Sequence, residues 1–121
     1  MIVSGIKWMS VEGREAAVTI TDGSFTCETF CHPCWVNVGD RVYEPLHILS
    51  VKYAFLSRDS EVGIWNIKNL GMSKKVIAQL EDVEQQILLV GQIALVADDA
   101  LPGGVKRGDI IELECGRIDL W

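Results

Sequence analysis

Four cysteines and two histidines are the residues whose types and spacing could do chemistry in this sequence. Cys31 and Cys34 are separated by two residues, which is the spacing of a metal-binding or redox pair. Thiolates and imidazoles are the usual ligands of structural zinc, so this pair could supply half of a tetrahedral site. The residues that could complete the site are Cys27, Cys115, His32 and His47.

The cysteines also have a redox and a structural interpretation. Thioredoxin-like sites place Cys-x-x-Cys at a helix N-terminus within a βαβ unit, whereas here a predicted hairpin precedes the motif and a predicted strand follows it. Cys27 and Cys115 alternate with apolar residues, as core thiols in strands do. We therefore expect four reduced cysteines and no cofactor, and zinc bound by Cys31 and Cys34 is the alternative.

No sequence motif of an enzyme accompanies these residues. The two histidines lack a Gly-x-Ser-x-Gly nucleophile elbow. The segment from Pro102 to Gly108 is rich in glycine and basic residues but lacks the Gly-Lys-Ser/Thr of a phosphate-binding loop. We expect a protein without catalytic residues.

Aromatic side chains are the remaining candidates for binding. The chain has four Trp, two Tyr and three Phe, and such residues fill cores, stack on bases or sugars, and are enriched at protein interfaces. Phe30 has the strand parity opposite to Cys27, which predicts that it faces outward near Trp35. The predicted binding residues are Phe30, Trp35, Tyr43 and Trp121.

Charge and hydropathy exclude several classes of function. Eleven Lys and Arg stand against 17 Asp and Glu, a net charge of −6, and the basic residues do not cluster. Binding to nucleic acid needs a clustered basic surface, so it is disfavoured. No apolar run approaches the roughly 20 residues of a membrane span, and the first residues lack the pattern of a secretory signal. We expect a cytoplasmic protein with no membrane partner.

The periodicity of apolar residues favours β-strands over a single domain, residues 1–121. Ala16, Val18 and Ile20 alternate before the Asp22-Gly23 pair, which predicts a hairpin over 15–31. A second hairpin is expected near 46–68, and the apolar run over 86–97 is expected to be one buried strand. Ser73 resembles a helix N-cap before apolar residues at helical spacing, which predicts one helix near 73–85. A last strand begins near Asp109.

This order of elements describes a small closed or half-open antiparallel β-barrel with one helix. It resembles the OB-fold (oligonucleotide/oligosaccharide-binding) superfamily, in which one helix lies between the third and fourth strands. The resemblance rests on element order and Gly-Asp turns, and matches no specific family. The hairpin near 46–68 has no place in the five-strand scheme. The resemblance implies single-stranded nucleic-acid binding on a barrel face.

The leading functional hypothesis is a non-enzymatic binding module that acts through a protein or subunit interface. High apolarity, 49% of the residues, makes a homodimer plausible because association buries apolar surface. Single-stranded nucleic-acid binding and a zinc module are the alternatives.

Overall fold

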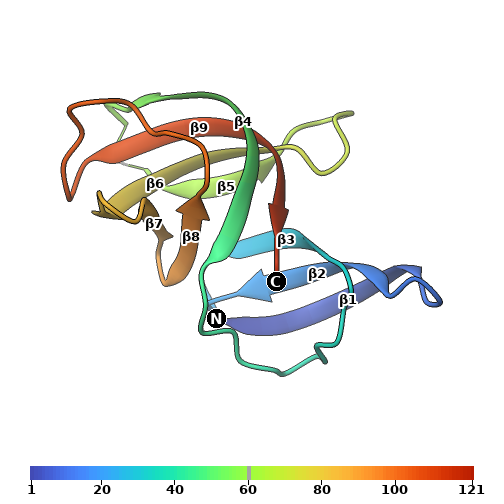
Figure 1. Cartoon of the computed structure of the whole chain (residues 1–121). Helices are drawn as coiled ribbons and strands as arrows, with labels where there is room; N and C mark the ends of the chain where they lie inside the picture. Colours follow the sequence, from blue (N-terminus) through green and yellow to red (C-terminus); the bar gives the residue numbers. More distant parts are fainter. Residues whose placement is uncertain (60) are drawn as a thin grey trace.

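The computed structural model describes residues 1–59 and 61–121, which form nine β-strands and no helix (Figure 1). The strands are β1 (Ile2–Ser10), β2 (Glu15–Thr21), β3 (Thr26–Cys31), β4 (Leu46–Leu56), β5 (Gly63–Asn66), β6 (Lys74–Asp82), β7 (Ile87–Val90), β8 (Ile93–Ala97) and β9 (Ile110–Asp119). Within these two ranges, nothing forms a helix that could cross a membrane.

Five of the strands close a small barrel. β4, β8, β7, β6 and β9 are neighbours in that order, and β9 pairs with both β4 and β6. The predicted small β-barrel is therefore confirmed, but its antiparallel character is wrong in one place, because β4 and β8 are parallel. Alternate residues of each strand point inward and form the core, as Ile111 and Leu113 do on β9.

β1, β2 and β3 form an antiparallel meander beside the barrel (Figure 1). The hairpin predicted over 15–31 is confirmed, with Ala16, Val18 and Ile20 fully buried. β3 joins the barrel through a short parallel pairing of Phe30 with Asp119 at the end of β9.

The predicted helix near 73–85 is wrong, because this segment is strand β6 followed by a turn. Val76, Ala78 and Leu80 follow the two-residue period of a strand and face the core. Ile77 is buried as well, but on the outer face of the barrel. Because β6 has buried apolar residues on both faces, Val76, Ile77 and Leu80 imitate the spacing of apolar residues in a helix. The nine-residue β6 pairs with β5, β7 and β9. These pairings outweigh the local helical propensity of the segment.

Two further expectations were wrong. β4 and β5 do not form the hairpin predicted near 46–68, because β4 pairs with β8 and β9 while β5 pairs with β6. Residue 60 of that hairpin lies outside the described residues. The apolar run over 86–97 is two strands, since Gly91 adopts a φ of 59° and reverses the chain between β7 and β8.

Strand β9 reaches both the barrel and the meander because its neighbour β4 bends with it. Ser50 of β4 has a φ of 58°, and an added Cβ at Gly116 of β9 would lie only 3.1 Å from the Cβ of Ser50. Just beyond, the register of β4 against β9 shifts between Val51 and Tyr53, as in a β-bulge. Glycine at 116 therefore permits the close approach.

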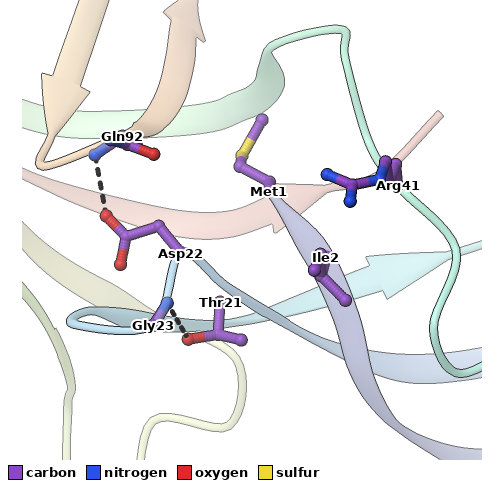
Figure 2. A pocket seen from close by; sticks show the side chains of 7 residues that line it. All are labelled: Met1, Ile2, Thr21, Asp22, Gly23, Arg41 and Gln92. Atoms are coloured by element: carbon purple, nitrogen blue, oxygen red, sulfur yellow. Dashed lines mark hydrogen bonds between the residues drawn. The ribbon is translucent and has the colours of Figure 1, made fainter.

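A polar contact fastens the meander to the barrel at the β7–β8 turn. The Asp22 carboxylate accepts hydrogen bonds from the backbone amides of Ser24 (2.8 Å), Phe25 (2.7 Å) and Gln92 (2.7 Å). Figure 2 shows the Gln92 contact at the rim of a cavity of about 310 Å³. The residues lining this cavity are Met1, Ile2, Thr21, Asp22, Gly23, Arg41 and Gln92. The Asp22 carboxylate at this cavity is already bound by backbone amides, whereas Arg41, which also lines it, forms no ion pair within residues 1–59 and 61–121.

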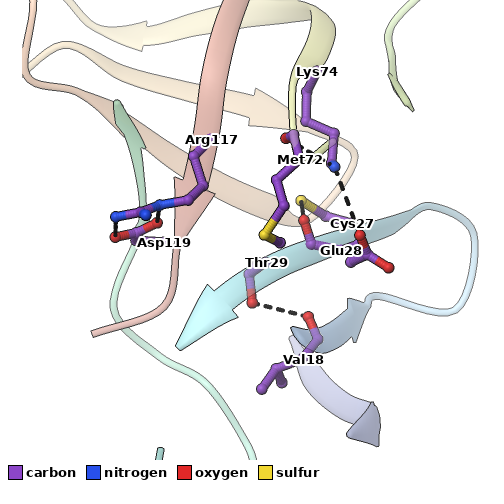
Figure 3. Close-up of polar contacts among 8 residues, drawn as sticks. All are labelled: Val18, Cys27, Glu28, Thr29, Met72, Lys74, Arg117 and Asp119. Atoms are coloured by element: carbon purple, nitrogen blue, oxygen red, sulfur yellow. Dashed lines mark hydrogen bonds and ion pairs between the residues drawn. The ribbon is translucent and has the colours of Figure 1, made fainter. Parts of the chain in front are cut away.

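A buried lysine forms a second junction between the two parts (Figure 3). Lys74 of β6 is 1% exposed, and its ammonium donates to the carbonyl of Met72 (3.1 Å) and lies 3.9 Å from the Glu28 carboxylate of β3. A buried charge without partners is costly, so these oxygens are what makes Lys74 tolerable there.

Replacing Gly91 by alanine should destabilise the protein more than replacing Gly71. Both glycines have a φ of 59°, but a Cβ at Gly91 would lie 2.6 Å from the Asp22 carboxylate and the Phe25 ring, whereas nothing lies within 4 Å at Gly71. Each variant loses about 1 kcal/mol to backbone strain. Gly91→Ala should lose about 2 kcal/mol more through overpacking. Urea unfolding measures both, and equal losses would contradict the docking of this turn on Asp22.

The contribution of Asp22 should disappear in acid. Burial raises the pKa of its carboxyl, but the hydrogen bonds from Phe25, Gln92 and Ser24 outweigh this and hold the pKa below the ordinary 3.8. Such a group stabilises the fold above the pKa of the unfolded chain, and this is lost as the pH falls through the folded pKa. Asp22→Asn should therefore cost about 1 kcal/mol at neutral pH, and this cost should shrink as the pH falls below 3.8. Unfolding curves that differ equally at every pH would contradict this.

Candidate interaction surface

The outer edge of β1 is covered over only part of its length. Near its start, the amide of Val3 donates to the carbonyl of Asp40 (2.9 Å), and the amide of Gly39 donates to the carbonyl of Val3 (2.8 Å). The connection from β3 to β4 supplies these partners as it passes along β1 (Figure 1). From Gly5 to Ser10, no strand or loop among the described residues pairs with this edge. An uncovered strand edge is a template for another strand.

Two tryptophans lie close to one arginine at the far end of this edge. The guanidinium carbon of Arg14 lies 3.8 Å from the ring centroid of Trp35 and 5.2 Å from that of Trp8. The backbone explains the stack: Arg14 Nε donates to the carbonyl of Cys34 (2.9 Å), and the amide of Cys34 donates to the carbonyl of Arg14 (2.7 Å). The turn after β1 and the loop after β3 are thus bonded together.

Large apolar side chains are exposed around this edge. The exposed fractions are 40% for Trp8, 56% for Met9, 66% for Val11 and 67% for Trp35. We call Gly5–Ser10 together with Val11, Arg14 and Trp35 the β1 edge surface. Several neighbouring exposed apolar residues on a soluble domain usually mark a site of association.

The structure places two of the four predicted binding residues, Trp35 and Tyr43, in the connection from β3 to β4, and the other two, Phe30 and Trp121, around the end of β9. Trp35 belongs to the β1 edge surface, and Tyr43 is exposed in the loop before β4. Phe30 packs against the guanidinium of Arg117, whose carbon lies 4.3 Å from the ring centroid. Figure 3 shows Arg117 held by the Asp119 carboxylate, at 2.6 Å from Nε and 2.9 Å from Nη2.

Trp121, the fourth predicted residue, stacks on His47. Their ring centroids are 3.5 Å apart and the planes differ by 10°. His47 Nδ1 lies 3.6 Å from the Asp98 carboxylate, which is too far for a hydrogen bond. His47 pairs with Asp119, which also pairs with Phe30, so Phe30 and Trp121 lie near one another across the end of β9.

The cysteines are all reduced and buried, and they form two pairs of neighbours. Burial, and then the hydrogen bond and charge of the neighbouring Cys34, raise the pKa of Cys31 to about 12. Burial raises the pKa of Cys27 to about 12 and that of Cys115 to about 11, although the charge of Lys74 acts in the opposite direction on both. Thiols with such pKa values stay protonated and unreactive at neutral pH.

No three His, Cys, Asp or Glu side chains in residues 1–59 and 61–121 are arranged to hold a metal ion. Cys27 and Cys115 have the ammonium of Lys74 beside them, and a cation there would repel zinc. No such group surrounds Cys31 and Cys34 in the part of the chain that the structure describes, and His32 is exposed, so the zinc site stays a prediction.

Sequence reasoning missed Trp8, Met9, Val11 and Arg14, because no strand was expected before residue 15. A signal was present: Glu12-Gly13 is a turn sequence, and it precedes a strand whose apolar face is strictly alternating. A turn before an alternating strand would have predicted a preceding strand, β1, paired with β2.

Comparisons of the chain with protein-family models, with curated proteins and with solved structures find no match.

The native protein should resist thiol reagents. At pH 8 a thiol with a pKa of about 12 is ionised in about one molecule in ten thousand, and Cys34 is fully buried. Alkylation by iodoacetamide, followed by mass spectrometry, should be at least about a hundredfold slower for the folded chain than in urea. Rapid modification of a single cysteine in the folded protein would contradict the burial described here.

Proposed function

We propose that this chain is a non-enzymatic protein-interaction module that assembles through the β1 edge surface. The occupant is β1 of a second copy, which pairs with this edge and joins the two meanders into one sheet. The single observation that supports the proposal most directly is the uncovered edge from Gly5 to Ser10 with exposed Trp8 and Met9 beside it.

Strand edges are suited to self-association. An antiparallel pair of identical strands satisfies a two-fold axis, so each copy offers and receives the same hydrogen bonds. The apolar side chains around the edge would lose water on pairing, which supplies a favourable free energy.

The Arg14 stack favours binding because it holds the indoles in place before a partner arrives. A side chain that is already ordered loses less entropy on association. The guanidinium also satisfies the loop carbonyl of Cys34, so the stack is fixed by hydrogen bonds as well as by cation–π contact.

The resemblance to the OB-fold remains a prediction, and so do nucleic-acid binding and a cytoplasmic location. The net charge of −6 opposes a nucleic-acid backbone, which places this alternative second. The absence of catalytic residues is likewise part of the proposal.

Lysines introduced at the β1 edge surface should weaken the proposed dimer. We expect the purified wild-type chain to dimerise with a Kd of about 10 µM, and Met9→Lys/Val11→Lys to weaken this at least about tenfold, since lysine protects natural edge strands. Leu70→Lys/Val83→Lys is the matched control, because it adds the same charge at exposed apolar positions in turns. Sedimentation velocity over a range of concentrations measures all three.

Two results would contradict the proposal. One is a wild-type chain that stays monomeric up to about 0.5 mM. The other is equal weakening by both double variants, which would indicate a general effect of charge. Circular dichroism checks that each variant is folded.

A further inference from the structure

The barrel carries a second exposed aromatic surface, on the side formed by β4, β9, β6 and β5. After the register shift in β4, Tyr53 and Phe55 point outward, while Ala54 between them packs toward the core. Their rings stack with centroids 5.6 Å apart and planes at 17°, and 40% of Tyr53 and 46% of Phe55 are exposed. Both rings are therefore partly open to solvent.

The registers of the four strands place acidic side chains next to this aromatic pair. Tyr53 lies opposite Glu114 and Phe55 opposite Glu112, and residues opposite each other in a sheet point to the same face. On the other side of β9, Glu114 lies opposite Lys75 and Glu112 opposite Ile77. Two carboxylates therefore lie between the aromatic pair and β6.

Trp65 of β5 forms the far border of this face. A Cβ at Gly63 would lie 2.6 Å from its indole carbons, so the ring lies flat over the glycine and beside Ile77, which pairs with Gly63. The Lys75 ammonium lies 5.6 Å from the ring centroid. Three strand spacings, about 14 Å, separate Trp65 from Tyr53. We call this face the barrel platform, with Tyr53, Phe55, Trp65, Lys75, Glu112 and Glu114.

Some charged residues of the platform have partners within the described residues, and one does not. The Glu114 carboxylate lies 3.4 Å from the Lys52 ammonium, and Lys75 lies over Trp65. Glu112 has no ion-pair partner in residues 1–59 and 61–121. After burial, the charges of Glu112 and Glu114 are what raise the pKa of Tyr53, so both carboxylates lie close to the phenol. The aromatic end of the platform therefore has an unneutralised negative charge.

We infer that the barrel platform binds a lysine or arginine side chain of a basic polypeptide segment. The cation lies against the exposed rings of Tyr53 and Phe55, and the Glu112 carboxylate is its counter-ion. Ring faces carry partial negative charge and attract cations, and a nearby carboxylate adds to this. The same carboxylate repels phosphates, so charge complementarity favours a basic peptide over an oligonucleotide. This site is separate from the β1 edge surface and does not depend on it.

The test is a titration of the full-length chain with tetralysine at physiological ionic strength, followed by amide chemical shifts in NMR. The expected result is that shifts concentrate in β4 and β9, and that fully acetylated tetralysine produces none. Glu112→Gln should weaken binding about tenfold, and Phe55→Leu about threefold, because it keeps apolar bulk but removes the ring. Both positions are at least partly exposed, so we expect both variants to fold.

Glu84→Gln is the matched control, because it removes the same charge from an exposed turn. The inference is overturned if Glu84→Gln weakens binding as much as Glu112→Gln, since the attraction would then come from net charge alone. It is also overturned if shifts fall outside β4 and β9, or if a thymidine decanucleotide binds the platform while tetralysine does not. Unchanged binding by Glu84→Gln together with loss in Glu112→Gln supports it.

Discussion

The close approach of β4 and β9 is the constraint on which the rest of the fold depends. At Ser50 and Gly116 the two strands come so near that any side chain at 116 would press on the Ser50 Cβ. This approach lets one continuous strand, β9, close the barrel against β6 and still reach β3 of the meander. Without it, the meander would be joined to the barrel mainly through Asp22 and Lys74. The absence of a side chain at Gly116 therefore allows the barrel and the meander to share one sheet.

The two proposed surfaces are consequences of that arrangement. Attaching the meander through β3 leaves β1 as an edge strand, and closing the barrel with β9 brings Glu112 and Glu114 between β4 and β6. In both places a cation lies near aromatic rings: Arg14 beside two indoles, and Lys75 over Trp65. The first cation helps to order the rings that it contacts. At the second surface, no cation of residues 1–59 or 61–121 lies over the Tyr53–Phe55 pair, and this difference distinguishes the proposed apolar interface from the proposed site for a charged ligand.

Local patterns predicted the parts of the fold that local interactions determine. The alternation of Ala16, Val18 and Ile20 before Asp22-Gly23 identifies the β2–β3 hairpin because neighbouring segments form it. The pattern around Ile77 was misleading because this residue is buried on the outer face of the barrel, where the Trp65 ring of β5 lies over its partner Gly63. Trp35 could be predicted as exposed, but its stack could not, because it requires a hydrogen bond between Arg14 and Cys34, twenty residues apart. The barrel platform depends on register across four strands, which no single segment specifies.

The place of β9 in the chain has a consequence for folding during synthesis. All three strands that it pairs with, β3, β4 and β6, precede it by many residues. The ribosome therefore releases an open sheet, with β4 and β6 unpaired along the sides that β9 later covers. Pairings between distant segments form slowly, and exposed edges in this interval are where nascent chains aggregate. Ile111 and Leu113 complete the core only when β9 is present, so the barrel cannot close before this strand has been synthesised.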